Sequence, residues 1–252
     1  MRLNATEAGT GPPVVLLHGL FGQARNFGVV QRRLAVARRV IALDLRNHGA
    51  SPHDLRADYG TMADDVAETL AFLGAAPCAV IGHSMGGKVA MRLALARPDL
   101  VERLLVGDIA PVPSPPRFGS IIAAMRGLDL RPGLTRAEAD AGMAAAVPEP
   151  GMRGFLLQNL RLGPAPAWGI GLAEIAAALP DIMDWPAIEG PYRGLAVFLL
   201  GERSDYVRTE DRPEIRRLFP RARFVTLRNA GHWLHADNPD GFVAVVEALL
   251  GA

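Results

Sequence analysis

The chain alternates short, continuous apolar runs with stretches in which apolar residues recur at helical spacing. The apolar runs are strand-sized and lie at residues 13–18, 40–43, 79–82, 103–107, 195–200 and 223–227. Strands that are apolar on both faces and alternate with helices are typical of a parallel sheet covered on both sides. The 252 residues, half of them hydrophobic, suffice for one large domain with a full core. We therefore expect an α/β domain with a mostly parallel central sheet flanked by helices.

The alternation is interrupted between about Pro111 and Glu189, where prolines are frequent and no strand run occurs. Helical patterns fill this part of the chain, at residues 118–128, 135–147, 152–162 and 172–182. Thr135 and Glu138 form a capping-box signature at the start of the second pattern. We therefore expect an all-helical insertion late in the chain, after which the α/β alternation resumes.

Composition and charge exclude several classes of protein. The formal net charge is +1, so no surplus of charge indicates a nucleic-acid partner or an anionic membrane. Cys78 is the one cysteine, which excludes an internal disulfide framework. The first residues lack the continuous apolar segment of a signal peptide, and no apolar run is long enough to span a bilayer. We expect a cytoplasmic monomer or small homo-oligomer with no membrane span.

The clearest indication of chemistry is the sequence Gly82-His-Ser84-Met-Gly86, between the predicted strand 79–82 and the helical pattern 86–96. A G-x-S-x-G sequence at a strand-to-helix turn exposes its serine as a nucleophile, because the small glycines permit a tight, strained turn. The N-terminus of the following helix is aimed at developing negative charge. Ser84 is therefore the candidate nucleophile.

The same segment nearly matches a phosphate-binding loop, since Gly82, Gly87 and Lys88 fit the pattern G-x-x-x-x-G-K. That loop needs a Ser or Thr after its lysine to bind Mg²⁺, and this chain has Val89 there. The pattern therefore does not favour a nucleoside triphosphatase. Lys88 is expected on the helix after the turn, in contact with solvent or in a local salt bridge.

A serine nucleophile needs a base, and His232 is the best candidate among the six histidines. In hydrolases with this motif the chain order is serine, acid, histidine, which removes the four histidines that precede Ser84. His232 follows the predicted strand 223–227, so it is expected at the same carboxyl edge of the sheet as Ser84. His235 is the weaker candidate, and a metal site made of His232 and His235 has no evident third ligand.

Several short segments resemble the α/β-hydrolase family over essentially the whole chain. They are Leu17-His-Gly-Leu-Phe-Gly22, Asp44-Leu-Arg-Asn-His-Gly-Ala-Ser51, Gly82-His-Ser-Met-Gly-Gly-Lys88, Gly107-Asp-Ile-Ala-Pro111 and Gly231-His-Trp-Leu-His-Ala236. The Arg-Asn-His-Gly and Ser-Met-Gly-Gly-Lys sequences narrow the resemblance to the YbfF-type bacterial acyl esterases, which are related to a mitochondrial abhydrolase. The resemblance implies an α/β-hydrolase fold whose core spans residues 1–111 and 189–252, with the helical insertion at 112–188 as its cap.

The acid of the expected triad is open between two residues. In the superfamily at large it usually follows the strand at 195–200, where this chain has Ser204 in the expected position and Asp205 one residue later. A shift of one residue in an extended segment turns a side chain to the opposite face. Asp108, at the end of the strand 103–107, is the preferred acid, and Asp205 is the alternative.

The resemblance implies a serine hydrolase that cleaves esters or thioesters of acyl chains through an acyl-enzyme, with Ser84 and His232 in a triad. It implies an oxyanion hole made of the backbone N–H groups of Leu20 and Met85, with Phe21 as the alternative second donor. No cofactor or metal is required. C–C bond hydrolysis, cofactor-free haloperoxidase chemistry and a non-catalytic ligand receptor on the same scaffold stay open. The large apolar side chains of the insertion either line an acyl pocket or form its own core: Phe118, Met125, Phe155, Trp168 and Trp185.

Overall fold

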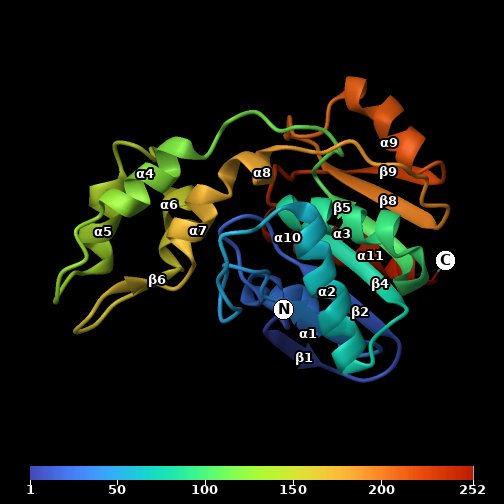
Figure 1. Cartoon of the computed structure of the whole chain (residues 1–252), viewed down its shortest axis with the longest axis horizontal. Coiled ribbons are helices and arrows are strands. Elements are labelled where there is room, and N and C mark those ends of the chain that lie inside the picture. Colours follow the sequence, from blue (N-terminus) through green and yellow to red (C-terminus); the bar gives the residue numbers. More distant parts are fainter. Residues whose placement is uncertain (252) are drawn as a thin grey trace.

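The computed structural model describes residues 1–251. Its centre is a seven-stranded sheet in the order β1-β3-β2-β4-β5-β8-β9 (Figure 1). The strands are β1 (Ala5–Ala8), β2 (Pro13–Leu17), β3 (Arg39–Leu43), β4 (Cys78–His83), β5 (Val101–Gly107), β8 (Leu195–Gly201) and β9 (Ala222–Leu227). Neighbouring strands pair in parallel except β1 and β3, which are antiparallel. The predicted parallel sheet is confirmed, and each apolar run corresponds to one strand.

β1 is a strand of this sheet that the apolar pattern did not predict. Its four residues are half-buried or exposed, and it pairs on one side only, with β3. An edge strand faces water, so it does not need the continuous apolar sequence of the inner strands. The sequence Ala-Thr-Glu-Ala therefore carries no recognisable strand signal.

Helices cover both faces of the sheet. They are α1 (Gly28–Leu34), α2 (Tyr59–Leu73), α3 (Met85–Ala96), α9 (Arg212–Leu218), α10 (Leu234–Asp237) and α11 (Pro239–Gly251), with short 3-10 helices η1 (Ala24–Phe27), η2 (Pro98–Leu100) and η3 (Thr209–Asp211). One core contains residues of α2, α3 and α9, and a second contains residues of α1 and α11 on the other face. Within residues 1–251, no helix has both the length and the apolar composition that crossing a bilayer requires.

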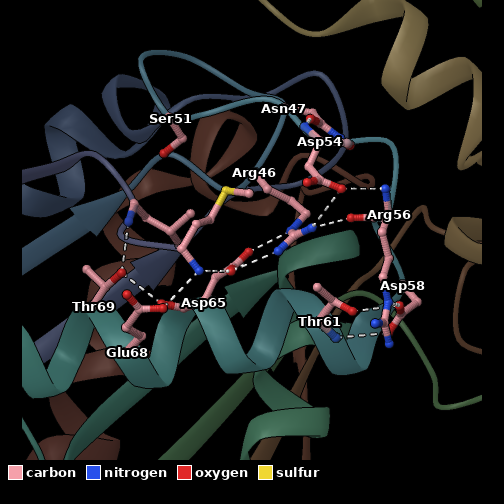
Figure 2. A network of polar contacts seen from close by, with 12 residues as sticks. Arg46, Asn47, Ser51, Asp54, Arg56, Asp58, Thr61, Asp65, Glu68 and Thr69 are labelled. Carbon is pink, nitrogen blue, oxygen red and sulfur yellow. Dashed lines mark hydrogen bonds and ion pairs between the residues drawn. The ribbon is translucent and has the colours of Figure 1, made fainter.

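The loop between β3 and α2 is fastened to α2 by a buried ion pair (Figure 2). Arg46 bonds both carboxylate oxygens of Asp65, with Nε–Oδ2 at 2.6 Å and Nη2–Oδ1 at 2.8 Å. At the end of the loop, Asp58 accepts the backbone N–H of Thr61 and so caps α2. The same loop carries His48, which contacts the segment that follows β2.

The insertion between β5 and β8 projects to one side of the sheet (green to yellow in Figure 1). Its helices are α4 (Gly119–Gly127), α5 (Arg136–Met143), α6 (Pro150–Leu157), α7 (Leu172–Ala177) and α8 (Leu179–Met183). The predicted capping box of Thr135 and Glu138 is formed at the start of α5. The expected helix at 152–162 is wrong beyond Leu157, and the insertion is not all-helical, because the two-residue strands β6 (Leu160–Arg161) and β7 (Ala167–Trp168) pair antiparallel. The glycine and prolines at residues 163–166 between them favour a turn over a helix.

Candidate active site

Ser84 lies at the tight turn between β4 and α3, with a positive φ of 53° and ψ of −121°. The turn depends on its two glycines. A Cβ on Gly82 would lie 2.1 Å from the carbonyl oxygen of Gly86, and a Cβ on Gly86 would lie 2.3 Å from that of Leu17. The strand and the helix therefore approach too closely for any side chain, and the strained serine is held at the carboxyl edge of the sheet.

His232 joins Ser84 to Asp108 in one line of hydrogen bonds. It lies in the loop between β9 and α10, where its Nε2 is 2.9 Å from Ser84 Oγ and its Nδ1 is 2.8 Å from Asp108 Oδ2. The carboxylate accepts, so Nδ1 carries a hydrogen and Nε2 is left to accept the serine hydroxyl. Three segments far apart in the sequence thus bring their polar groups together at one edge of the sheet.

Asp108 is held where it can orient His232. It directly follows β5, has a positive φ of 52°, and its side chain is 1% exposed. Its Oδ1 accepts the backbone N–H of Gly201 at 3.1 Å, and its Oδ2 also accepts the hydroxyl of Ser204. Ser204, which occupies the usual position of the acid in the superfamily, therefore supports Asp108 instead of replacing it.

Asp205, the alternative acid, has a different partner. Its side chain is 75% exposed and both carboxylate oxygens bond Arg117, at 3.2 and 3.1 Å. The guanidinium of Arg117 holds the pKa of Asp205 below its usual value. The hydrogen bond from His232 Nδ1 goes to Asp108, and Asp205 belongs to a surface ion pair beside the site.

Two residues that sequence reasoning missed hold the His232 loop. The ring of Tyr206 stacks on the imidazole of His232, with centroids 3.6 Å apart and an interplanar angle of 15°. His83 donates from Nε2 to the carbonyl oxygen of His232 at 2.7 Å. Burial keeps the pKa of His83 well below its usual value, so this ring is neutral. The sequence holds one indication for each residue: His83 directly precedes Ser84, and Tyr206 directly follows Asp205.

Two buried histidines shape the loop that follows β2, which carries Leu20. His18 Nδ1 donates to the carbonyl of Gly19 at 2.8 Å, and its Nε2 accepts the backbone N–H of Leu45 at 2.9 Å. His48 Nε2 accepts the backbone N–H of Phe21 at 3.1 Å. The N–H of Phe21, the alternative oxyanion donor, is therefore already bonded. Burial lowers the pKa of His18, and it lowers the pKa of His48 to about 3.

Met85 is the first residue of α3, so its backbone N–H has no acceptor within the helix. Leu20 borders the same cavities as Ser84. The two amides expected to form the oxyanion hole thus belong to the start of α3 and to the loop after β2, both of which border a cavity that Ser84 also borders.

Two cavities meet at Ser84. The larger cavity has a volume of about 910 Å³ and the smaller cavity about 200 Å³. His232 and Trp233 border the larger cavity, whereas Met85 and Lys88 border the smaller. Four residues border both: Leu20, Ser84, Phe118 and Tyr206.

Lys88 lies on α3 as expected, but the expectation of solvent contact or a local salt bridge is wrong, because the residue is 1% exposed and forms no salt bridge within the described residues. Its Nζ donates to Ser114 Oγ and to the carbonyl of Asp184, both at 3.1 Å. Burial lowers its pKa to about 8. Lys88 therefore ties α3 to the two ends of the insertion, which the helix pattern alone does not show.

The apolar side chains of the insertion divide between bordering a cavity and packing inside the insertion. Phe118 and Phe155 border the larger cavity. Met125 is fully buried, and the Trp168 indole donates to its carbonyl at 3.0 Å, so both belong to the packing of the insertion. Trp185 is buried beside the ring of Tyr59.

His235 packs on the ring of Phe27, and burial lowers its pKa to about 4. Its Nδ1 is buried without a partner. Among residues 1–251, no group of three or more histidine, cysteine, aspartate or glutamate side chains is arranged to hold a metal ion.

Comparison with known proteins places the chain. The model of the alpha/beta hydrolase family matches residues 14–245. The sn-1-specific diacylglycerol lipase ABHD11 of Mus musculus is 44% identical over 250 residues, covering 96% of this chain and 81% of that protein. The esterase YbfF of Escherichia coli is 36% identical, and the match covers 99% of both chains. A solved structure of a marine microorganism esterase has a TM-score of 0.95 at 36% identity and covers 98% of this chain and 99% of that one.

The two curated relatives are named as a lipase and an esterase, and the solved structure, also named as an esterase, shares the fold. The chain is accordingly an enzyme with hydrolase activity of the esterase type. Together, the seven-stranded sheet, the serine turn and the family match show that this chain belongs to the alpha/beta hydrolase family.

Proposed function

We propose that this chain is a serine hydrolase that cleaves carboxylic esters or thioesters of acyl chains, with Ser84, His232 and Asp108 as its triad. The observation that carries the proposal is the line of hydrogen bonds from Ser84 Oγ through His232 to Asp108, at 2.9 and 2.8 Å. This line borders a cavity of about 910 Å³, a size that takes a small-molecule substrate.

In the proposed reaction, Ser84 Oγ attacks the substrate carbonyl carbon while His232 Nε2 takes the hydroxyl proton. His232 then gives this proton to the leaving oxygen or sulfur, and the acyl group stays on Oγ. Water next attacks the acyl-enzyme as Nε2 takes one of its protons, which returns to Ser84 Oγ when the acid leaves. Asp108 accepts the Nδ1 hydrogen throughout and so fixes the tautomer and stabilises the imidazolium.

The developing negative charge on the carbonyl oxygen needs donors that are already in place. The backbone N–H of Met85, at the start of α3, and that of Leu20 are proposed for this role. The bond from Phe21 to His48 supports Leu20 over Phe21 as the second donor. Fixed amides aimed at the oxyanion are typically the largest single electrostatic contribution in acyl transfer.

We further propose that residues 112–188 act as a cap over a core made of 1–111 and 189–252. Phe118, Met152 and Phe155 of this segment border the larger cavity. The name of the mouse relative indicates a lipid ester as its substrate, which suits an apolar wall of this kind. The cap is therefore the part that selects the substrate.

Covalent labelling tests the proposal directly. A fluorophosphonate is expected to modify Ser84, located by mass spectrometry, and to leave the Ser84→Ala variant unlabelled. p-Nitrophenyl esters and acyl-CoA thioesters of matched chain length then decide between oxygen and sulfur leaving groups. Labelling of another serine, or no labelling of the folded protein, would contradict the proposal and favour a non-catalytic ligand receptor.

A further inference from the structure

We infer that the two cavities divide the substrate at Ser84, so that a short acyl group occupies the smaller cavity and a large leaving group the larger cavity. The inference rests on the proposed function, because it takes Ser84 as the nucleophile and His232 as the proton donor. It adds a substrate class, namely esters of short acids with bulky alcohols or thiols.

The direction follows from where the proton must go. His232 has to protonate the leaving atom, so that atom lies within hydrogen-bond reach of Nε2. Within the described chain, His232 borders the larger cavity and is absent from the border of the smaller one. The leaving group thus extends into the larger cavity. The acyl chain, on the other side of the carbonyl carbon, is directed to the cavity that Met85 borders.

The volumes then set the size of each part. The smaller cavity, at about 200 Å³, has less than a quarter of the volume of the larger cavity, so it suits the smaller part of the substrate. The larger cavity, at about 910 Å³, lies near the upper end of the range for drug-sized ligands.

Hydrogen bonds fix the wall of the smaller cavity. Lys88, one helical turn beyond Ser84, bonds Ser114 and Asp184 at the two ends of the insertion. The backbone N–H of Ser114 donates to the carbonyl of Met183 at 2.7 Å, and the buried hydroxyl of Tyr59 donates to that of Ile182 at 2.6 Å. Expansion for a longer acyl chain would break these bonds, of which the bond of Tyr59 is fully buried, so the wall resists widening.

A pair of isomeric esters tests the direction. Octyl acetate and ethyl octanoate have the same atoms, but one carries its long chain in the alcohol and the other in the acid. We expect kcat/KM, measured by pH-stat, to be at least tenfold higher for octyl acetate. Equal rates, or a preference for ethyl octanoate, would overturn the inference while leaving the serine hydrolase intact. No hydrolysis of either ester or of p-nitrophenyl acetate by folded protein would overturn the proposed function, and the inference with it.

Two half-buried methionines of the insertion provide matched variants. Met183 borders the smaller cavity and Met152 the larger. Met183→Ala is expected to raise the rate ratio of p-nitrophenyl octanoate to p-nitrophenyl acetate about tenfold. Met152→Ala is expected to leave that ratio unchanged and to alter the ratio of octyl acetate to ethyl acetate. The reverse pattern would place the acyl chain in the larger cavity and overturn the inference.

Discussion

The core and the insertion contribute to the site in different ways. On the core side, each polar group is held by several hydrogen bonds, and Asp108 alone accepts from Gly201, Ser204 and His232. On the insertion side, Phe118 and Phe155 offer apolar surface. The groups proposed for the chemistry are thus held in fixed positions, whereas the surface proposed to contact the substrate offers mainly shape and apolar area. Sequence change in the insertion is therefore the natural route to a new substrate on the same chemistry.

Removal of the proposed nucleophile is expected to have the largest effect on activity. Ser84→Ala should lower kcat for a p-nitrophenyl ester by about 10⁵- to 10⁶-fold, since the triad acts as a unit. The unfolding midpoint should change little, because the half-buried hydroxyl is replaced without a new cavity. Steady-state kinetics and thermal unfolding together check this. An Ser84→Ala protein with parental kcat would end the comparison, because the chemistry would then lie elsewhere.

Substitution of each candidate acid tests whether catalysis depends on Asp108, the carboxylate that bonds His232. Asp108→Asn is expected to lower kcat by about 10³- to 10⁴-fold, because the amide favours the wrong tautomer of His232. Asp205→Asn, one residue after Ser204 and bonded to Arg117, is the matched control and should retain most of the parental kcat. If Asp205→Asn were the inactive variant, the assignment of the acid would be wrong.

Loss of an ion pair should lower the free energy of unfolding more in the core than in the insertion. Asp65→Asn removes the close, buried charge partner of the Arg46 guanidinium and leaves only the half-exposed Asp54, at 3.9 Å, so it is expected to cost about 3 kcal/mol of unfolding free energy. Asp140→Asn removes the ion pair with Arg153 on the insertion, where the Asp140 side chain is 38% exposed and Arg153 keeps its hydrogen bonds to the carbonyls of Val147 and Pro148. Its unfolding midpoint in urea should stay near that of the parent. Similar losses in both variants would contradict the contrast.

Acid should destabilise the core through its neutral histidines, since residues 112–188 contain none. The pKa of His48 is lowered to about 3 in the fold against 6.5 unfolded, so the unfolded chain binds more protons between these values. Stability is therefore complete above pH 6.5 and is lost as the pH falls, at about 1.4 kcal/mol per pH unit for each such group.

Urea unfolding of the parent and of His48→Gln at pH 7, 5.5 and 4.5 measures this contribution. The variant should lose less stability per pH unit than the parent. Parallel curves for the two proteins would show that His48 is not held neutral by burial.

Strong periodic patterns were sufficient to predict the inner strands and most helices, and chain order together with the glycine-flanked turn was sufficient to select Ser84 and His232 as neighbours. The edge strand β1 and the ribbon of β6 and β7 escaped, because short exposed strands have no apolar pattern. The choice between Asp108 and Asp205 depends on which carboxylate reaches His232. That depends on how the segments after β5 and β8 are placed in the folded chain, which the sequence pattern does not show. The burial of Lys88 escaped for a similar reason, since the atoms that bond its ammonium come from both ends of the insertion.

Lys88 is the single lysine in the sequence, and both it and Val89 are buried within α3. A protease that cuts after lysine therefore has one bond to cleave, and it reaches that bond when α3 unfolds. If α3 refolds faster than the protease cuts, the rate of cleavage measures the fraction of molecules in which α3 is unfolded. Cleavage at this one bond would therefore measure the opening of α3, the helix that follows Ser84.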